Sequence, residues 1–271
     1  MTDLNTFLHY QPPALLLQDR IIVITGAGDG IGKAAAQAFA QFGATVVLLG
    51  RTLSKLEAVY DTIEAAGGPK PAIFPINLEG AGPQDYEQLK IALDNEFGRV
   101  DGLLHNASEL GGRTPLGQYS TSDWQKVMQV NVTAPFLLTR ALLPLLQKSA
   151  DPRVVFTGSS VGVKGRAYWG AYAVSKGATE TLMEVLADEL EQTPIRVNSI
   201  NPGATRTSMR ATAYPAEDPA VVTPPEALMN RYVFLFGPDS KEWHGLQLNA
   251  QPPGFDSAQP PGFDSAQPPS Y

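Results

Sequence analysis

The sequence predicts an α/β fold, a single doubly wound domain in which helices cover both faces of a parallel sheet. Short runs rich in Ile, Val and Leu alternate with longer stretches that carry the apolar spacing of helices. The short runs are nearly continuous in apolar residues, as is typical of parallel strands that are buried on both faces. Strict alternation of strand and helix predicts right-handed βαβ units, and no shift in composition marks a second domain between residues 20 and 250.

Six apolar runs are expected to form the strands, and five stretches between them the helices. The expected strands are 21–25, 45–50, 71–76, 100–105, 153–158 and 195–201. The expected helices are 31–43, 53–68, 85–98, 121–146 and 172–192. The first helix ends at Gly43, since glycine readily adopts the conformation that caps a helix C-terminus.

The two ends of the chain differ from this central domain of residues 20–250. Residues 1–19 are expected to form an N-terminal extension, and residues 251–271 a tail rich in proline and glycine. The sequence QPPGFDSA occurs twice in tandem at the start of the tail. Without apolar periodicity, such a segment is typical of a solvated, extended chain. The alternatives are a binding motif anchored on Phe255 and Phe263, or an artefact of cloning or of the gene boundary.

Charge and composition argue against several classes of function. With 20 Lys and Arg against 27 Asp and Glu, the formal net charge is −7, which gives no reason to expect nucleic acid or an anionic membrane as a partner. No run approaches the roughly 20 apolar residues of a membrane span, and the N-terminus lacks the features of a secretory signal. The absence of cysteine excludes disulfides and thiolate chemistry, and three scattered histidines predict no metal cluster. A cytoplasmic protein is therefore expected.

A glycine-rich turn, TGAGDGIG, joins the first strand to the first helix. Its spacing is G-x-x-x-G-x-G, formed by Gly26, Gly30 and Gly32. The P-loop pattern fails because positions 27 and 34 are both alanine, and G-x-G-x-x-G fails because position 31 is isoleucine. Backbone N–H groups at a positive helix end suit a pyrophosphate, and glycines let the ligand approach closely. We therefore predict a dinucleotide site here; the alternative is a plain tight turn.

The end of the second expected strand indicates which dinucleotide binds. At this position an acidic residue accepts hydrogen bonds from a ribose 2′-hydroxyl, whereas an arginine accommodates a 2′-phosphate. The strand is followed by Arg51 and no carboxylate. The planar guanidinium matches phosphate, which favours NADP over NAD, although Asp29 within the glycine turn argues the other way.

Tyr172 and Lys176 lie four residues apart in the segment AYAVSK. This spacing places both side chains on one face of a helix. Taken alone, the pair is also compatible with an ordinary, partly exposed helix face. The other motifs of the chain have to decide between these interpretations.

Five motifs in order resemble the short-chain dehydrogenase/reductase family over roughly residues 18–250. They are TGAGDGIG (25–32), HNAS (105–108), VNV around Asn131, GSSVG (158–162) with the following YAVSK, and NPGATRT (201–207). Several longer segments are most similar to the YciK-type oxidoreductases of bacteria. The resemblance implies a Rossmann-like fold, a nicotinamide cofactor and a homo-oligomer, either a homodimer or a homotetramer.

The resemblance also implies roles for four catalytic residues. Tyr172 is the expected acid/base, and Lys176 the cation that favours its phenolate and binds the nicotinamide ribose. Ser159 is expected to polarise the substrate carbonyl, because the serine of the family lies thirteen positions before the tyrosine; Ser160 is the competitor. Asn131 is expected to hold a water for proton relay, or else to satisfy backbone groups inside its helix.

The expected cofactor contacts extend from the glycine turn to the segment after the sixth strand. They are Gly26, Asp29, Gly30, Ile31, Gly32, Arg51, Asn77, Leu78, Asn106, Ala107, Tyr172, Lys176, Pro202, Gly203, Thr205 and Thr207. Two positions depart from the motif N-N-A-G of the family, since His105 replaces the first asparagine and Ser108 the glycine. The side chain at position 108 is expected to crowd the loop above the nicotinamide.

Residues 204–222 are expected to cover the substrate, because ligands of such folds bind beyond the carboxyl ends of the strands. Met209 and Tyr214 suggest an apolar wall, while Arg206 and Arg210 either meet an anionic group or are ordinary surface charges. We expect a small-molecule oxidoreductase that moves a hydride between NADP(H) and a carbonyl or alcohol. A catalytically silent NADP-binding sensor or interaction protein is the alternative.

Overall fold

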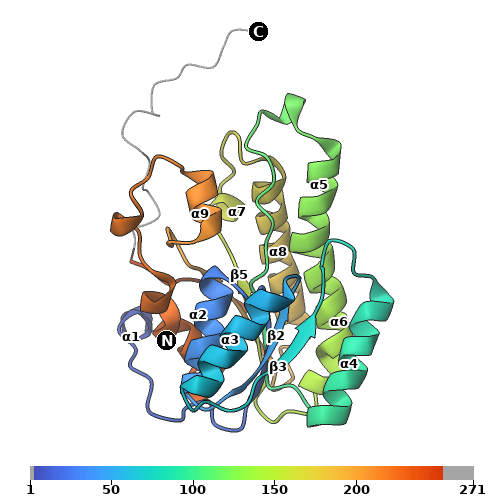
Figure 1. Cartoon of the computed structure of the whole chain (residues 1–271), viewed down its shortest axis with the longest axis vertical. Coiled ribbons are helices and arrows are strands. Elements are labelled where there is room, and N and C mark those ends of the chain that lie inside the picture. Colours follow the sequence, from blue (N-terminus) through green and yellow to red (C-terminus); the bar gives the residue numbers. More distant parts are fainter. Residues whose placement is uncertain (1–2, 253–271) are drawn as a thin grey trace.

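The computed structural model describes residues 3–252, and its centre is a seven-stranded sheet in which every pairing is parallel (Figure 1). The strand order is β3-β2-β1-β4-β5-β6-β7. The strands are β1 Ile21–Thr25, β2 Thr45–Gly50, β3 Ala72–Pro75, β4 Gly102–His105, β5 Arg153–Thr157, β6 Arg196–Asn201 and β7 Leu246–Asn249. The predicted doubly wound α/β fold is confirmed.

Helices cover both faces of the sheet, and each layer has its own apolar core (Figure 1). One layer holds α1 Leu4–Leu8, α2 Gly30–Gln41, α3 Leu53–Ala65 and α10 Met229–Phe236. The other holds α4 Pro83–Phe97, α6 Ala134–Leu146 and α8 Gly170–Glu189, and α5 Thr121–Met128 packs against α8 on the same side. Along β1, Ile22 and Ile24 face the first layer and Val23 the second, which is the alternation of a strand buried on both sides.

Several short elements were not predicted, because each is too short to show a period of its own. They are α1, α7 Ser160–Val163, α9 Ser208–Ala213, α10, β7 and four 3₁₀ turns at Leu116–Gln118, Pro219–Val221, Pro225–Leu228 and Pro238–Ser240. The expected helix 121–146 is interrupted by a π-helical turn at Gln129–Thr133, which separates α5 from α6.

The two expected extensions are placed only in part. Phe7 of α1 and Leu17 are both fully buried in the core beside α10, so the N-terminal segment packs onto the domain. Gln251, the first residue of the expected tail, is buried and hydrogen-bonded to the domain. The rest of the tail, residues 253–271 with Phe255 and Phe263, lies outside the described residues.

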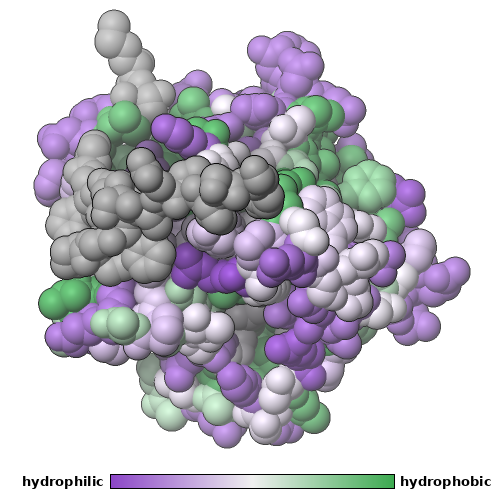
Figure 2. All heavy atoms as spheres, turned by 90° about the horizontal axis from the view of Figure 1, so that it is seen from above, coloured by the Kyte–Doolittle hydropathy of each residue, from purple (hydrophilic) through white to green (hydrophobic). Residues whose placement is uncertain are grey.

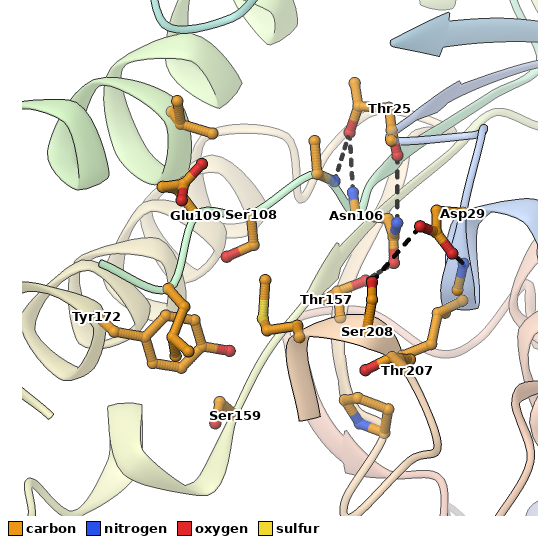
Figure 3. Close-up of a pocket in the computed structure, with 18 of the residues that line it drawn as sticks. Thr25, Asp29, Asn106, Ser108, Glu109, Thr157, Ser159, Tyr172, Thr207 and Ser208 are labelled. Carbon is orange, nitrogen blue, oxygen red and sulfur yellow. Dashed lines mark hydrogen bonds between the residues drawn. The ribbon is translucent and has the colours of Figure 1, made fainter. Parts of the chain in front are cut away.

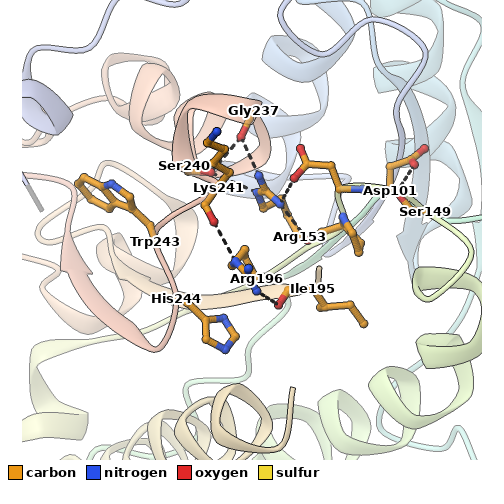
Figure 4. A network of polar contacts seen from close by, with 12 residues as sticks. Asp101, Ser149, Arg153, Ile195, Arg196, Gly237, Ser240, Lys241, Trp243 and His244 are labelled. Carbon is orange, nitrogen blue, oxygen red and sulfur yellow. Dashed lines mark hydrogen bonds and ion pairs between the residues drawn. The ribbon is translucent and has the colours of Figure 1, made fainter. Parts of the chain in front are cut away.

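A buried arginine fastens the amino-terminal edge of the sheet (Figure 4). Arg153, at the start of β5, has a fully buried side chain and forms an ion pair of 2.6 Å with Asp151. Its guanidinium also donates to Ser240 Oγ at 3.2 Å and to the Gly237 carbonyl at 3.4 Å. Because a buried charge is tolerated only when it is paired and hydrogen-bonded, this contact set binds the turn after α10 to the sheet.

The strand order creates a crevice at the opposite edge of the sheet. The chain winds outward from β1 to β2 and β3, and then returns to place β4 on the other side of β1. At such a switch point the connections leave the sheet in opposite directions, which opens a crevice beyond the carboxyl ends of the strands. The predicted site residues lie around this crevice.

Candidate active site

A cavity of about 420 Å³ occupies the crevice at the carboxyl ends of β1, β4 and β5. Apart from Gly32 and Asn131, every site residue predicted from the sequence lines it. Figure 2 looks down on this end of the molecule, where hydrophilic and hydrophobic side chains are interspersed over the visible surface.

At the glycine turn, the backbone conformations and the close contacts disfavour any residue larger than glycine. Gly26 and Gly30 have φ angles of 67° and 50°, in the left-handed region that glycine adopts without strain. A Cβ at Gly32 would lie 2.2 Å from the carbonyl oxygen of Gly26. Gly32 therefore holds the shape of the turn from behind, whereas Gly26 and Gly30 face the cavity.

Asp29 closes the first turn of α2 and is paired with a lysine that the sequence analysis missed. One carboxylate oxygen accepts from the Gly30 N–H at 2.7 Å, and the other accepts from Lys55 Nζ at 2.7 Å. The hydrogen bond from Lys55 is the main cause that lowers the pKa of Asp29. Lys55 lies on α3, 26 residues along the chain, and also lines the cavity.

Thr25, at the end of β1, holds the loop that follows β4 (Figure 3). Its Oγ1 accepts from the N–H groups of Asn106 at 2.9 Å and Ala107 at 3.0 Å. The Asn106 side chain donates to the Thr25 carbonyl at 3.3 Å. His105, which precedes this loop, is buried against Phe156 and bonds Thr139 at 2.8 Å, so it belongs to the packing of the sheet.

The far end of the cavity carries the residues predicted for the adenosine. Arg51 has an exposed side chain, and its Nη1 lies 3.8 Å from a carboxylate oxygen of Glu109. Asn77 and Leu78 line the same end, where Asn77 Oδ1 accepts from the Glu79 N–H at 3.3 Å.

Tyr172 and Lys176 project from the first two turns of α8, and both are buried. Burial raises the pKa of Tyr172 to about 12, opposed by the hydroxyls of Ser159 and, to a smaller degree, Ser108. Burial also lowers the pKa of Lys176 to about 8, opposed by Glu180 one turn further along. Lys176 Nζ donates to the Thr157 carbonyl at 2.8 Å and lies 5.7 Å from the centre of the Tyr172 ring.

Three hydroxyls face one another at this point of the cavity. Figure 3 shows the Tyr172 hydroxyl between those of Ser108 and Ser159. Ser159 is the residue before α7 and has an extended backbone, while Ser160 begins the helix. Of the two serines considered from the sequence, Ser159 is thus the one beside the tyrosine.

Asn131 lies in the π-helical turn and contacts backbone instead of the cavity. Its Oδ1 accepts from the Glu109 N–H at 2.7 Å, and its Nδ2 donates to the Glu109 carbonyl at 3.0 Å and to Ser175 Oγ at 2.9 Å. Its own carbonyl, to which Pro135 four residues further on has no N–H to donate, accepts from Thr179 Oγ1 at 3.1 Å. The expected backbone contacts are therefore present, and the relay of a water stays a prediction.

The segment after β6 forms the remaining wall. Pro202, Gly203, Thr205 and Thr207 line the cavity, and Thr207 lies across from Gly30. Gln251 supports this wall from behind, because its Nε2 donates to the carbonyls of Pro202 at 2.7 Å and Ala204 at 2.9 Å.

The end of the cavity beside Tyr172 is apolar and aromatic. Leu110, Val161 and Ala213 pack there with Trp169, Met209 and Tyr214. The Trp169 ring lies 5.7 Å from the Tyr172 ring and 6.0 Å from the Tyr214 ring. The predicted apolar wall of Met209 and Tyr214 is therefore present.

The two arginines considered from the sequence differ in their positions. Arg210 forms a two-pronged ion pair with Glu217, at 2.7 and 2.6 Å, and stacks 3.8 Å from the centre of the Tyr214 ring. Its charge is thus matched by a carboxylate. Arg206 is exposed and lies outside the cavity lining.

Comparison with known proteins shows the family of this chain. The sequence profile of the short chain dehydrogenases matches residues 20–218. This chain belongs to the short-chain dehydrogenase/reductase family. It is 51% identical over 245 residues to the oxidoreductase YciK of Escherichia coli, covering 90% of this chain and 97% of YciK, which confirms the predicted likeness to that subgroup.

Solved structures of similar proteins share the fold. A short chain dehydrogenase from Pseudomonas syringae is 56% identical, with a TM-score of 0.88 over 93% of this chain and 100% of that one. A short chain dehydrogenase from Escherichia coli CFT073, complexed with NADPH, is 51% identical, with a TM-score of 0.87 over 89% of this chain and 100% of that one. This oxidoreductase family is thus shown by sequence and by structure.

Among residues 3–252 no helix combines the length and the apolar character needed to cross a bilayer. Nor do three or more His, Asp or Glu side chains of this part of the chain gather as metal ligands.

Proposed function

We propose that the protein is an NADP(H)-dependent oxidoreductase that moves a hydride between the nicotinamide and a small carbonyl or alcohol substrate, with Tyr172 as the acid/base. The observation that carries this proposal is the convergence of the Tyr172 and Ser159 hydroxyls, with Lys176 beside them, in a cavity that begins at the glycine turn.

The residues around the glycine turn suit a dinucleotide. A Cβ at Gly26 would stand 3.0 Å from the backbone of Ala107, and one at Gly30 would stand 3.1 Å from Thr207, so side chains here would fill the cradle. The N-terminus of the 12-residue helix α2 opens onto the same space and favours a pyrophosphate. Arg51 at the far end offers a fork of donors for a 2′-phosphate. The complex of the Escherichia coli CFT073 relative with NADPH supports the same cofactor.

The chemistry assigned to the bound cofactor is the supply of a hydride, which carries two electrons to the carbonyl carbon. Tyr172 would give its phenolic proton to the oxygen that becomes an alkoxide. Its raised pKa supports this role in reduction, because the phenol stays protonated at neutral pH. Ser159 would donate to the same oxygen, and Lys176, positively charged below a pKa of about 8, would favour the phenolate that remains.

The wall beside Tyr172 favours a substrate with an apolar part. Trp169, Tyr214 and Leu110 offer burial to hydrocarbon. Of the two arginines considered for an anionic group, Arg210 is engaged by Glu217 and Arg206 lies outside the cavity lining, whereas Arg166 lines the cavity. Aryl and alicyclic ketones, aldehydes and quinones are therefore the first compounds to test.

The deciding experiment is NADPH oxidation, followed by absorbance, over a panel of such carbonyls with wild-type protein and Tyr172→Phe. NADPH binding to both proteins is measured separately by fluorescence. We expect turnover by the wild type, and equal NADPH binding with turnover lost in the variant. Tight binding of NADPH without turnover of any compound would instead favour the silent sensor.

The assembly and the location of the protein belong to the same proposal. A homodimer or homotetramer is expected from the family, and a cytoplasmic location from the composition and the N-terminal sequence. Light scattering on the purified full chain tests the assembly, and cell fractionation tests the location.

A further inference from the structure

Ser108 presents an unexpected hydroxyl to the reacting end of the cavity. The corresponding position of the family motif is a glycine, and this chain carries a serine whose Oγ is buried. Within residues 3–252 this Oγ makes no hydrogen bond of normal geometry. It faces the Tyr172 hydroxyl from the side opposite Ser159 (Figure 3). A buried hydroxyl without a good partner is costly, so its presence calls for a ligand or a charge that it meets during function.

The backbone on both sides of Ser108 is fixed, so its side chain has a defined direction. The Ala107 N–H donates to Thr25 Oγ1 at 3.0 Å. On the other side, Asn131 accepts from the Glu109 N–H at 2.7 Å and donates to the Glu109 carbonyl at 3.0 Å. With the Ala107 and Glu109 backbones held by these hydrogen bonds, Ser108 keeps only the rotation of its side chain and of its O–H bond. The hydroxyl can therefore turn its proton towards Tyr172 without a movement of the loop.

We propose that Ser108 is a positioning residue for Tyr172, and that its hydroxyl donates a hydrogen bond to the tyrosine oxygen when that oxygen is a phenolate. This inference rests on the proposed function. During reduction the carbonyl π bond breaks as the hydride arrives, the O–H bond of Tyr172 breaks, and a new O–H bond forms on the substrate. The negative charge that remains is on the Tyr172 oxygen, and Ser108 is an available donor beside it. In alcohol oxidation the same phenolate is the base that must be present at the start.

The charged and titratable groups around Tyr172 are the same with or without the Ser108 hydroxyl. They are Lys176 and Glu180 from α8, Arg166 from the segment before α8, Glu109 and Arg113 from the loop after β4, and Arg210, Tyr214 and Glu217 from the segment around α9. A change in the pH dependence of a Ser108 variant therefore reports the lost donor.

The sign of the effect follows from which form of Tyr172 each direction needs. Oxidation requires the phenolate, so its rate rises with pH at all pH values below the pKa of Tyr172, which burial raises to about 12. Loss of a donor to the anion raises that pKa and moves the rise to higher pH. A hydrogen bond to a charged group is strong enough to move it by about one pH unit, which is about a tenfold lower oxidation rate below that pKa.

The test is the pH dependence of kcat/KM in both directions for wild type, Ser108→Ala, Ser108→Gly and Ser108→Thr. Alanine removes the hydroxyl and keeps Cβ, glycine removes both, and threonine keeps the hydroxyl. At each pH below the pKa of Tyr172, alanine and glycine should lower the oxidation rate about tenfold, with the same rise of rate with pH as in the wild type. Threonine should keep the wild-type oxidation rates, and all three should bind NADPH as the wild type does.

Three results separate this inference from the proposed function. If Tyr172→Phe abolishes turnover while Ser108→Ala keeps the wild-type oxidation rates, the role of Ser108 is overturned and the proposed function stands. If glycine speeds the reaction at every pH and alanine does not, the side chain acts through its bulk alone, and the inference is again overturned. If Tyr172→Phe retains wild-type turnover, the proposed function fails and this inference fails with it.

Discussion

The side chain of Asn131 brackets the backbone of Glu109, accepting from its N–H at 2.7 Å and donating to its carbonyl at 3.0 Å. One amide group thereby joins the π-helical turn to the loop that carries Ser108. The loop position depends on a residue that lies 22 positions away in the sequence.

Replacing Asn131 should loosen this loop more than it weakens cofactor binding. Asn131→Ala leaves the Glu109 backbone groups unpaired, and each such group costs about 1–3 kcal/mol. Asn131→Asp keeps an acceptor for the Glu109 N–H but turns a second oxygen towards the Glu109 carbonyl, so it should be destabilised as well. Chemical denaturation measures the loss, and kcat should fall more than NADPH affinity. Wild-type stability in both variants would contradict a stabilising role for the two hydrogen bonds between Asn131 and the Glu109 backbone.

Gly32→Ala should distort the glycine turn and weaken NADPH binding, although Gly32 does not line the cavity. Its new Cβ would meet the Gly26 carbonyl oxygen at 2.2 Å, which forces the turn to shift. Overpacking of this kind costs about 1–3 kcal/mol, so NADPH affinity should fall by about tenfold to a hundredfold. Gly117→Ala is the matched control, because nothing lies within 4 Å of its added Cβ. Calorimetric titration with NADPH distinguishes the two variants.

Arg51 and Glu109 should have opposite effects on cofactor choice. If Arg51 binds the 2′-phosphate, Arg51→Ala should weaken NADPH about tenfold or more and leave NADH unchanged, since charge-assisted hydrogen bonds contribute about 1.5–3 kcal/mol. Glu109→Gln removes a carboxylate 3.8 Å from that guanidinium and should tighten NADPH. Fluorescence titrations with both cofactors check this pair. Equal losses for NADPH and NADH in Arg51→Ala would refute the assignment.

Lys176 should make the protein more stable as the pH rises through the alkaline range. Its pKa falls from 10.5 to about 8 because the ammonium is buried. Between these values the unfolded chain binds a proton that the folded chain has released, so the free energy of unfolding increases with pH. Lys176→Met should remove this slope and, by removing a buried charge, raise stability at neutral pH while turnover is lost. Urea denaturation at several pH values tests the slope, and a variant with the wild-type slope would show that another group causes it.

Replacing Arg153 tests whether the stability of the sheet can be lowered without a change in NADPH affinity. Arg153→Ala removes the donor to Ser240 and to the Gly237 carbonyl, and leaving a buried polar group unpaired costs about 1–3 kcal/mol. The Asp151 side chain is 36% exposed and keeps its contact with Arg20, so the lost ion pair should add little. NADPH affinity should not change, because Arg153 lies at the amino-terminal edge of the sheet. Denaturation and NADPH titration of one sample answer both questions.

The fold was predictable because the central strands can be recognised from their own residues alone. The runs 21–25 and 45–50 match β1 and β2 residue for residue, since strands buried on both faces are continuous in apolar residues. By contrast, β7 is a short edge strand with only alternate burial, and it was missed. The π-helical turn was missed although Pro135, which has no N–H for the Asn131 carbonyl, stands in the sequence. The Thr179 hydroxyl that donates to this carbonyl comes from a different helix.

The candidate site was predicted where motifs mark it and missed where single polar contacts do. Lys55 reaches Asp29 from the next helix, and Gln251 reaches Pro202 from 49 residues away. Neither residue belongs to a pattern with fixed spacing, so only the folded chain reveals it. Ser108 was noticed as a departure, but as bulk; the direction of its hydroxyl depends on hydrogen bonds from the neighbouring backbone to Thr25 and Asn131.

Gln251 also limits how the chain can be shortened for crystallisation or labelled for assay. Removing the repeats from residue 253 onward keeps its amide on the carbonyls of Pro202 and Ala204, whereas a cut two or more residues earlier removes it. A truncation that ends at residue 250, just before the first QPPGFDSA repeat, would release the cavity wall and mimic a catalytic defect. A label is better attached after residue 252 than in place of the residues before it.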